Sequence, residues 1–194
     1  MKVHRHTLMI LAVFMLLTVF SCRQDYTPKP RGFVRIDIPA QAYRDFDTNF
    51  PYYFQYPVYA EIVAHEHADR EPYWINIVYP QFNGQIYISY KKIDNNLVEY
   101  LEDSRSFVMK HIPKASSIDD TLITDRDRNV FGMIYYIHGT GAASPCQFFV
   151  TDSSTHFLRG ALYFNFTPDN DSLAPVIDLI EKDIRHLVST VRWR

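Results

Sequence analysis

Alternating apolar and polar residues dominate most of the chain beyond its N-terminal end, and this pattern predicts β-strands. In Gln85–Lys91, for example, Ile86 and Ile88 fall on the same side of an extended backbone. Asn83-Gly84 separates this run from Tyr73–Tyr79, a pairing that predicts a hairpin. Further strands are expected over residues 33–37, 52–56, 61–64, 117–124, 129–138, 146–151 and 155–166.

Two segments carry apolar residues at helical spacing. The first begins at Asn95 or Asn96 and ends before Pro113. The second begins at Asp171-Ser172, has Pro175 in its first turn and carries basic residues near its end. The apolar face of the first is Leu97, Leu101, Ser104, Val108 and His111 or Ile112, and that of the second is Leu173, Ile177, Ile180, Ile184, Leu187 and Val191.

This order of strands, helix, strands and terminal helix predicts an α+β fold, with two main helices packed on an antiparallel β-sheet. The order is similar to that of PsbP/Mog1-like sandwiches, by analogy of element order only.

The first 21 residues are typical of an export signal. Lys2 and Arg5 give a basic start, and Thr7–Phe20 is a largely apolar run shorter than the roughly 20 residues that span a bilayer. Ser21-Cys22 ends the run, and a small residue directly before a cysteine is typical of a bacterial lipoprotein signal. We expect cleavage before Cys22 and acylation of its thiol and new amine, which gives stable anchoring. An ordinary secretory signal that happens to end near a cysteine is the alternative.

Residues 22–32 are polar and contain prolines, so we expect an extended, lipidated tether. Residues 33–194 are expected to form one globular domain. With Cys22 acylated, only Cys146 remains, so no disulfide can form within the chain and the core must hold the fold. The formal net charge of −2, which becomes more negative without the signal, argues against nucleic acid as a partner.

Recognisable catalytic motifs are absent: the sequence has no Gly-x-Ser-x-Gly, His-Glu-x-x-His, phosphate loop or Cys-x-x-Cys. His65 and His67 are the weak candidates for a metal site, with Glu61, Glu66 or Asp69 as a third ligand. A solvated loop is the favoured interpretation, because two imidazoles supply only half of a tetrahedral shell. We therefore expect no enzyme activity, no metal and no cofactor.

Two further features have both an ordinary and a chemical interpretation. The segment 139–144 superficially resembles a nucleotide loop, but Pro145 and a strand follow it where such a loop would open a helix, so a β-connection is favoured. Cys146 is expected to be a small core residue. A nucleophilic role would require His138 or His156 beside it.

Aromatic residues are abundant, and four of them form a tyrosine-rich segment, namely Tyr52, Tyr53, Tyr56 and Tyr59. They form either a glycan-stacking platform or, more commonly, part of the sheet faces. Asp120-Thr121-Leu122 and Asp171-Ser172-Leu173 match a short O-glycan acceptor motif, although three residues match easily by chance.

Across nearly the whole mature chain the sequence closely resembles the GldD family, the gliding motility-associated lipoproteins of Bacteroidota. The segments that carry the resemblance are residues 28–37, 74–80, 95–111, 147–152, 156–164 and 171–176. The resemblance implies a lipoprotein needed for gliding and linked to the type IX secretion machinery. It assigns no catalytic residue, cofactor or substrate, so Cys22 is the one functional residue that it implies here.

We therefore expect a non-enzymatic assembly or scaffold factor that docks protein partners of the gliding and type IX secretion apparatus. The alternatives are a periplasmic glycan- or small-ligand-binding lipoprotein that uses the tyrosine-rich segment, and a hydrolase of unfamiliar type. Arg23 follows Cys22, where Asp would favour inner-membrane retention, and no acidic cluster of the kind linked to surface export follows. The periplasmic leaflet of the outer membrane is favoured over the inner membrane.

Replacing the expected acylation site tests the anchor directly. Cys22→Ala removes the thiol that carries the lipid, so the protein should move from the membrane pellet to the soluble fraction and lose palmitate labelling. Cys146→Ala is the matched control and should stay in the membrane. A Cys22→Ala protein that remained membrane-bound would contradict the lipoprotein assignment.

Overall fold

The computed structural model describes residues 36–66 and 68–194, whose strands build two antiparallel sheets. The larger sheet has the order β3-β4-β5-β9-β8-β7-β6, and the smaller has the order β1-β2-β10. The strands are β1 (Tyr43–Phe46), β2 (Tyr52–Pro57), β3 (Glu61–Ala64), β4 (Ile75–Tyr79), β5 (Gly84–Lys92), β6 (Ser117–Asp125), β7 (Val130–His138), β8 (Cys146–Thr151), β9 (His156–Phe164) and β10 (Arg192–Trp193). The helices are α2 (Leu97–Met109) and α3 (Asn170–Thr190), with short 3-10 turns at Pro80–Phe82 and Ile112–Lys114.

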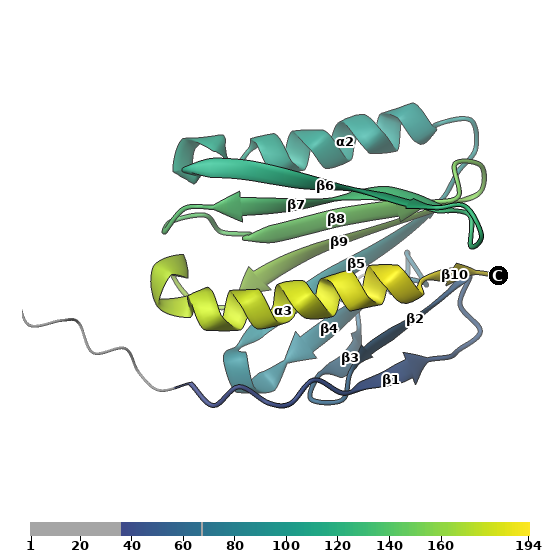
Figure 1. The fold of residues 1–194 in the computed structure, drawn as a ribbon. Helices are drawn as coiled ribbons and strands as arrows, with labels where there is room; N and C mark the ends of the chain where they lie inside the picture. Colours follow the sequence, from purple (N-terminus) through teal and green to yellow (C-terminus); the bar gives the residue numbers. More distant parts are fainter. Residues whose placement is uncertain (1–35, 67) are drawn as a thin grey trace, which may run out of the picture. The chain divides into compact units, whose positions relative to one another are not determined.

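The seven-stranded sheet is covered on both faces, so the described residues form three layers. Helix α3 and the small sheet pack on one face, and helix α2 lies over the other (Figure 1). The main core lies on the α3 side and joins Phe54 of β2 and Ile184 of α3 to the large sheet. A smaller cluster on the α2 side surrounds Phe149 and Phe157.

Alternation along a strand distributes its residues between these two cores. In β9, Leu158 and Leu162 belong to the core under α3, whereas Phe157 packs in the cluster under α2. Because both faces of β9 are covered, the strand is apolar over most of its length. Arg159 is the conspicuous exception on the α2 face.

The predicted fold class is confirmed, since every described strand pair is antiparallel and both predicted helices are present. The prediction of a strand over 33–37 is wrong at Ile36 and Asp37, which have no regular structure, while 33–35 lie outside the described residues. The last strand was predicted too long, since β9 ends at Phe164. Strands β1 and β10 were not predicted, because they are short and rich in polar residues.

The predicted hairpin at Asn83 is present in a tighter form. Pro80–Phe82 makes a 3-10 turn, Asn83 takes a left-handed conformation with φ of 49°, and Gly84 is already the first residue of β5. Asparagine tolerates this conformation better than most residues do. Tyr79 and Gly84 therefore pair directly, as the alternating pattern requires.

Helix α3 begins one residue earlier than the sequence predicted. Pro175 consequently lies in the second turn and not in the first. The predicted apolar stripe is buried except at Leu173, which is partly exposed. Asp183 is also fully buried on this helix, which the apolar pattern did not anticipate.

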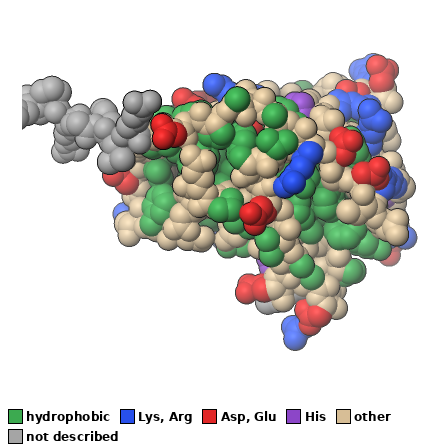
Figure 2. Space-filling model, turned by 90° about the horizontal axis from the view of Figure 1, so that it is seen from below, with side chains coloured by type: hydrophobic (Ala, Val, Ile, Leu, Met, Phe, Trp, Pro, Cys, Tyr) green, Lys and Arg blue, Asp and Glu red, His purple; other side chains and the backbone are tan. Residues whose placement is uncertain are grey.

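The outer surface that carries β1 mixes hydrophobic side chains with both signs of charge. Figure 2 shows this side, where Lys, Arg, Asp and Glu side chains are scattered among apolar ones. No helix among the described residues is long and apolar enough to cross a bilayer.

Close packing against a neighbouring strand makes two strand glycines sensitive to substitution. A Cβ on Gly132 would lie 2.0 Å from the carbonyl oxygen of Phe149, and one on Gly160 would lie 2.2 Å from the buried ring of Phe148. We expect Gly132→Ala and Gly160→Ala each to lower the free energy of unfolding by roughly 1–3 kcal/mol, measured by urea denaturation. Gly141→Ala is the control, because the nearest atom to its Cβ is 3.7 Å away on a lysine side chain. Equal free energies of unfolding for all three variants would show that neighbouring residues make room for the added Cβ without loss of stability.

Candidate functional site

A pocket of about 410 Å³ opens on the α2 face of the large sheet. Its walls come from α2, β5, β9 and the β3–β4 loop. Alternate residues of β5 and β9 point toward α2, which explains how aromatic side chains distant in sequence meet there. The aromatic residues of the lining are Trp74, Tyr87, Tyr100, Phe107, Phe157 and Tyr163.

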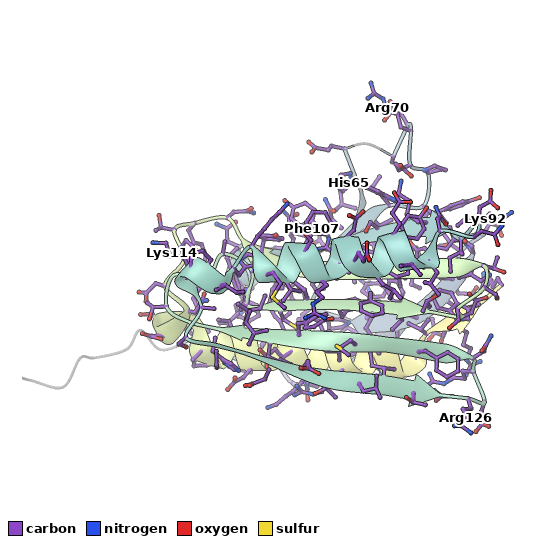
Figure 3. The ribbon with its side chains drawn as sticks, turned by 90° about the horizontal axis from the view of Figure 1, so that it is seen from above. His65, Arg70, Lys92, Phe107, Lys114 and Arg126 are labelled. Carbon is purple, nitrogen blue, oxygen red and sulfur yellow. The ribbon has the colours of Figure 1, made fainter. Side chains whose placement is uncertain are left out.

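The rim beside the β3–β4 loop is built by Trp74 and His65. The Trp74 indole N–H donates to the carbonyl oxygen of Tyr90 at 2.9 Å, which fixes the ring over the sheet. The His65 ring lies edge-on to Trp74, with centroids 5.3 Å apart. Lys91 lies 5.1 Å from the centre of the indole and forms an ion pair with Glu71. Figure 3 shows Phe107 on α2 and His65 at the base of the β3–β4 loop, on the same side of the helix.

Arg159 of β9 places a positive charge in this aromatic pocket. Its Nη2 donates to Oε1 of Gln147 at 2.7 Å, and its guanidinium carbon lies 4.5 Å from the centre of the Phe107 ring. Burial lowers the pKa of Arg159, while Tyr163 and Asp103 act in the opposite direction. Among the described residues no carboxylate lies within 4.0 Å of the guanidinium, so its charge is held without an ion pair.

A series of hydrogen bonds through Gln147 and His111 orients Arg159. Gln147 is 1% exposed, accepts from Arg159 through its oxygen and donates through Nε2 to Nε2 of His111 at 3.0 Å. Burial and then the charge of Arg159 lower the pKa of His111, which favours the neutral ring that can accept this bond. The guanidinium is therefore held in one position with further N–H donors available.

Ser104 of α2 adds a second polar group to the pocket wall. The residue is 3% exposed, and its Oγ has no hydrogen-bond partner among the described residues. Buried hydroxyl groups are rarely left unpaired, because the loss of hydration is not repaid. The pocket thus combines aromatic surface, one fixed cation and one unused hydroxyl, which is an arrangement suited to binding a ligand.

The sequence-predicted metal ligands lie only partly within the described residues. His65 lies at the pocket rim, whereas His67 lies outside the described residues, so the His65–His67 hypothesis stays a prediction. No group of three or more His, Cys, Asp or Glu side chains within 36–66 and 68–194 could hold a metal ion. Cys22, the signal and the tether up to residue 32 also lie outside the described residues.

The tyrosine-rich segment does not form a stacking platform. The favoured interpretation, that its rings belong to the sheet faces, agrees with the burial of Tyr52 and Tyr56. Tyr52 is fully buried and donates to the carbonyl oxygen of Tyr73, and Tyr56 is also buried. Tyr53 is partly exposed and donates to Asp45, whereas Tyr59 turns inward toward α3. Alternation along β2 separates Tyr53 from Tyr52 and Tyr56, and Tyr59 follows the end of the strand.

Tyr59 is part of a buried cluster around the carboxylate of Asp183. The hydroxyl of Tyr59 donates to Asp183 at 2.7 Å, and that of Tyr43 donates at 3.1 Å. Burial raises the pKa of Asp183, although these hydrogen bonds oppose the effect. Burial, followed by the charge of Asp183, raises the pKa of Tyr43 to about 12. The cluster joins β1, the β2–β3 connection and α3, which indicates a structural role.

Cys146 is a fully buried core residue, as the sequence predicted. Burial raises the pKa of its thiol well above the ordinary value, and this disfavours the reactive thiolate. The segment 139–144 joins β7 to β8, which confirms the β-connection. Asn170 of α3 holds it by donating to the carbonyl oxygens of Gly139 and Ala142.

The two proposed glycan acceptors lie on the surface. Thr121 is exposed in edge strand β6, and Ser172 is exposed in the first turn of α3, where its hydroxyl donates to Asp169.

Arg159 and Ser104 were not recognised from the sequence as site residues. One signal was present, namely a charged residue within a nine-residue, otherwise mostly apolar strand that is buried on both faces. Ser104 was expected on the buried face of its helix, and it does lie there. Its position in the same pocket as Arg159 depends on how α2 lies over the sheet, which neither local pattern reveals.

The fold and the pocket define an antiparallel α+β protein with a pocket suited to ligand binding under α2. A search of curated proteins finds no match. Among solved structures, the cyanobacterial PsbP protein (CyanoP) of Synechocystis sp. PCC 6803 is similar at 10% sequence identity and a TM-score of 0.47, over 81% of this chain and 95% of that one. The family model described as gliding motility lipoprotein GldD matches residues 23–193. The chain therefore belongs to the GldD family of gliding motility lipoproteins.

The raised pKa of Asp183 predicts a specific pH dependence of stability. The folded state binds the proton of this carboxyl more tightly than the unfolded chain does, so its stabilising contribution is complete below about pH 4 and is lost as pH rises through the folded-state pKa. Asp183→Asn removes this titration. We expect the variant to gain stability relative to the native protein as pH rises, by at most about 1.4 kcal/mol per pH unit, in urea melts between pH 4 and 8. A constant difference across this range would mean that the carboxyl has an ordinary pKa.

Proposed function

We propose that this protein is a lipid-anchored, non-enzymatic component of the gliding and type IX secretion machinery, where it assembles or positions protein partners. The observation that carries the proposal is the family match, which begins at residue 23 and extends to residue 193. It starts directly after Cys22, the residue at which the sequence predicts lipidation. The polar, proline-containing residues 23–32 then provide a short tether between lipid and fold.

The chemistry of the described residues supports a role in binding. The pocket under α2 offers aromatic surface and a fixed cation, both of which recognise ligands without transforming them. Cys146, the remaining cysteine, is buried and has a raised thiol pKa, which is typical of a packing residue. Contact is therefore the mode of action that these groups favour.

The proposed location is the periplasmic leaflet of the outer membrane. Acyl chains on Cys22 would hold the protein at the bilayer, and Arg23 directly after it does not match the Asp that favours inner-membrane retention. Protease shaving of intact cells should leave the protein undigested. Digestion would place it on the cell surface instead.

Deletion of the gene in a gliding bacterium tests the function. We expect loss of spreading on agar and loss of secretion of a type IX cargo, and plasmid-borne native protein should restore both. A Cys22→Ala protein, present at the native level, should restore neither or do so weakly, because it is no longer concentrated at the membrane. Cys146→Ser is the control for the other cysteine and, where it accumulates normally, should restore both.

A deletion strain that glides and secretes normally would contradict the proposal. A strain that secretes normally but does not glide would restrict the role to motility. Assembly as the mode of action predicts that crosslinking in the native membrane captures other components of the apparatus.

A further inference from the structure

We propose that the pocket under α2 binds a small organic carboxylate whose body is aromatic or aliphatic, with Arg159 and Ser104 as the groups that recognise the carboxylate. The proposal rests on the pocket geometry and does not depend on the role in gliding. A fixed cation, an unpaired hydroxyl and six aromatic rings meet in one recess of about 410 Å³.

The guanidinium of Arg159 is prepared to receive an acceptor. Gln147 occupies one of its nitrogen atoms, and the ring of Phe107 covers one face of the group. No carboxylate of the described chain lies within ion-pair distance, so the remaining donors are available. A partly buried cation without an anion is costly, and a bound carboxylate would supply the missing charge in the planar geometry that arginine prefers.

Ser104 gives an independent indication of a ligand. The residue is 3% exposed and lines the same pocket, and its Oγ lacks a partner within the described residues. A ligand oxygen within reach of this hydroxyl would satisfy it. Two unrelated polar groups, one from a strand and one from a helix, therefore both favour an oxygen acceptor in the pocket.

The surrounding charges favour an anion with one negative charge. Asp103 also lines the pocket, and its charge acts on Arg159 from beyond ion-pair distance. A doubly charged phosphate would be repelled by Asp103, while Lys91 is already paired with Glu71. A monocarboxylate balances Arg159 alone. Its apolar body would pack against the aromatic residues, of which Phe157 is buried.

Binding of 3-phenylpropionate tests the proposal. The mature lipidated protein is reconstituted in phospholipid nanodiscs and titrated by isothermal titration calorimetry, with empty nanodiscs as the blank for partition into lipid. We expect saturable binding of 3-phenylpropionate. Neutral 3-phenylpropan-1-ol lacks the carboxylate, and acetate lacks the apolar body. Each should therefore bind at least about tenfold more weakly.

Two variants assign the binding to this pocket. Arg159→Met should weaken the binding of 3-phenylpropionate at least about tenfold and remove the preference for acid over alcohol. Ser104→Ala should weaken it several-fold without loss of thermal stability, since it removes an unpaired hydroxyl. Arg185→Gln is the matched control, because Arg185, like Arg159, lies against an aromatic ring, that of Tyr136, but is outside the pocket. This control should bind like the native protein.

Several results would overturn the proposal: no saturable heat up to about 10 mM acid, equal binding of the acid and the alcohol, or unchanged binding by Arg159→Met. If Arg159→Met does not fold, as judged by circular dichroism, unchanged affinity in Ser104→Ala overturns it instead.

The peptide Gly-Gly-Phe and its C-terminal amide distinguish the source of the carboxylate. Tighter binding of the peptide acid than of 3-phenylpropionate would indicate the end of a protein chain, and weaker binding would indicate a free acid.

Discussion

Burial of the large sheet on both faces is the constraint on which the rest of this structure depends. Since α3 and the small sheet cover one face and α2 covers the other, each inner strand must supply apolar side chains in both directions. Strand β9 does so with Leu158 and Leu162 on one side and Phe157 on the other. A polar residue in such a strand needs a specific compensation, and this requirement is what makes Arg159 informative.

The buried charged group of each face, Asp183 on one and Arg159 on the other, has different partners. On the α3 side, Asp183 accepts hydrogen bonds from Tyr43 and Tyr59, so its oxygens are satisfied within the protein and the group ties β1 to the helix. On the α2 side, Arg159 has Gln147 as its hydrogen-bond partner but no ion pair, and Ser104 has no partner in the described chain. The first arrangement is complete and structural. In the second, the hydroxyl of Ser104 lacks a partner within the described residues, and it lines the same pocket as Arg159.

Much of the fold follows from local pattern. The predicted limits of β2, β3, β6, β7 and β8 agree with the observed strands to within about a residue, because alternation, proline and turn residues mark their ends. Local pattern fails where tertiary contacts decide. Strand β10 is two residues long and exists because it pairs with β2, and β1 has two exposed polar residues in four. The tyrosines of β2 illustrate the same limit, since their abundance was visible but their burial was not.

The sequence by itself determined the order of strands and helices, the fold class and the family, and it predicts the anchor at Cys22, because these depend on periodicity and on contiguous motifs. The tertiary structure alone decided the site. Ser104, Gln147 and Arg159 come from a helix and two strands spread over more than fifty residues. Gln147 reaches Arg159 because β8 pairs with β9, and Ser104 lines the same pocket as Arg159 because α2 lies over this face. Such proximity depends on strand order and helix placement, and these are set by the burial of distant apolar surfaces against one another.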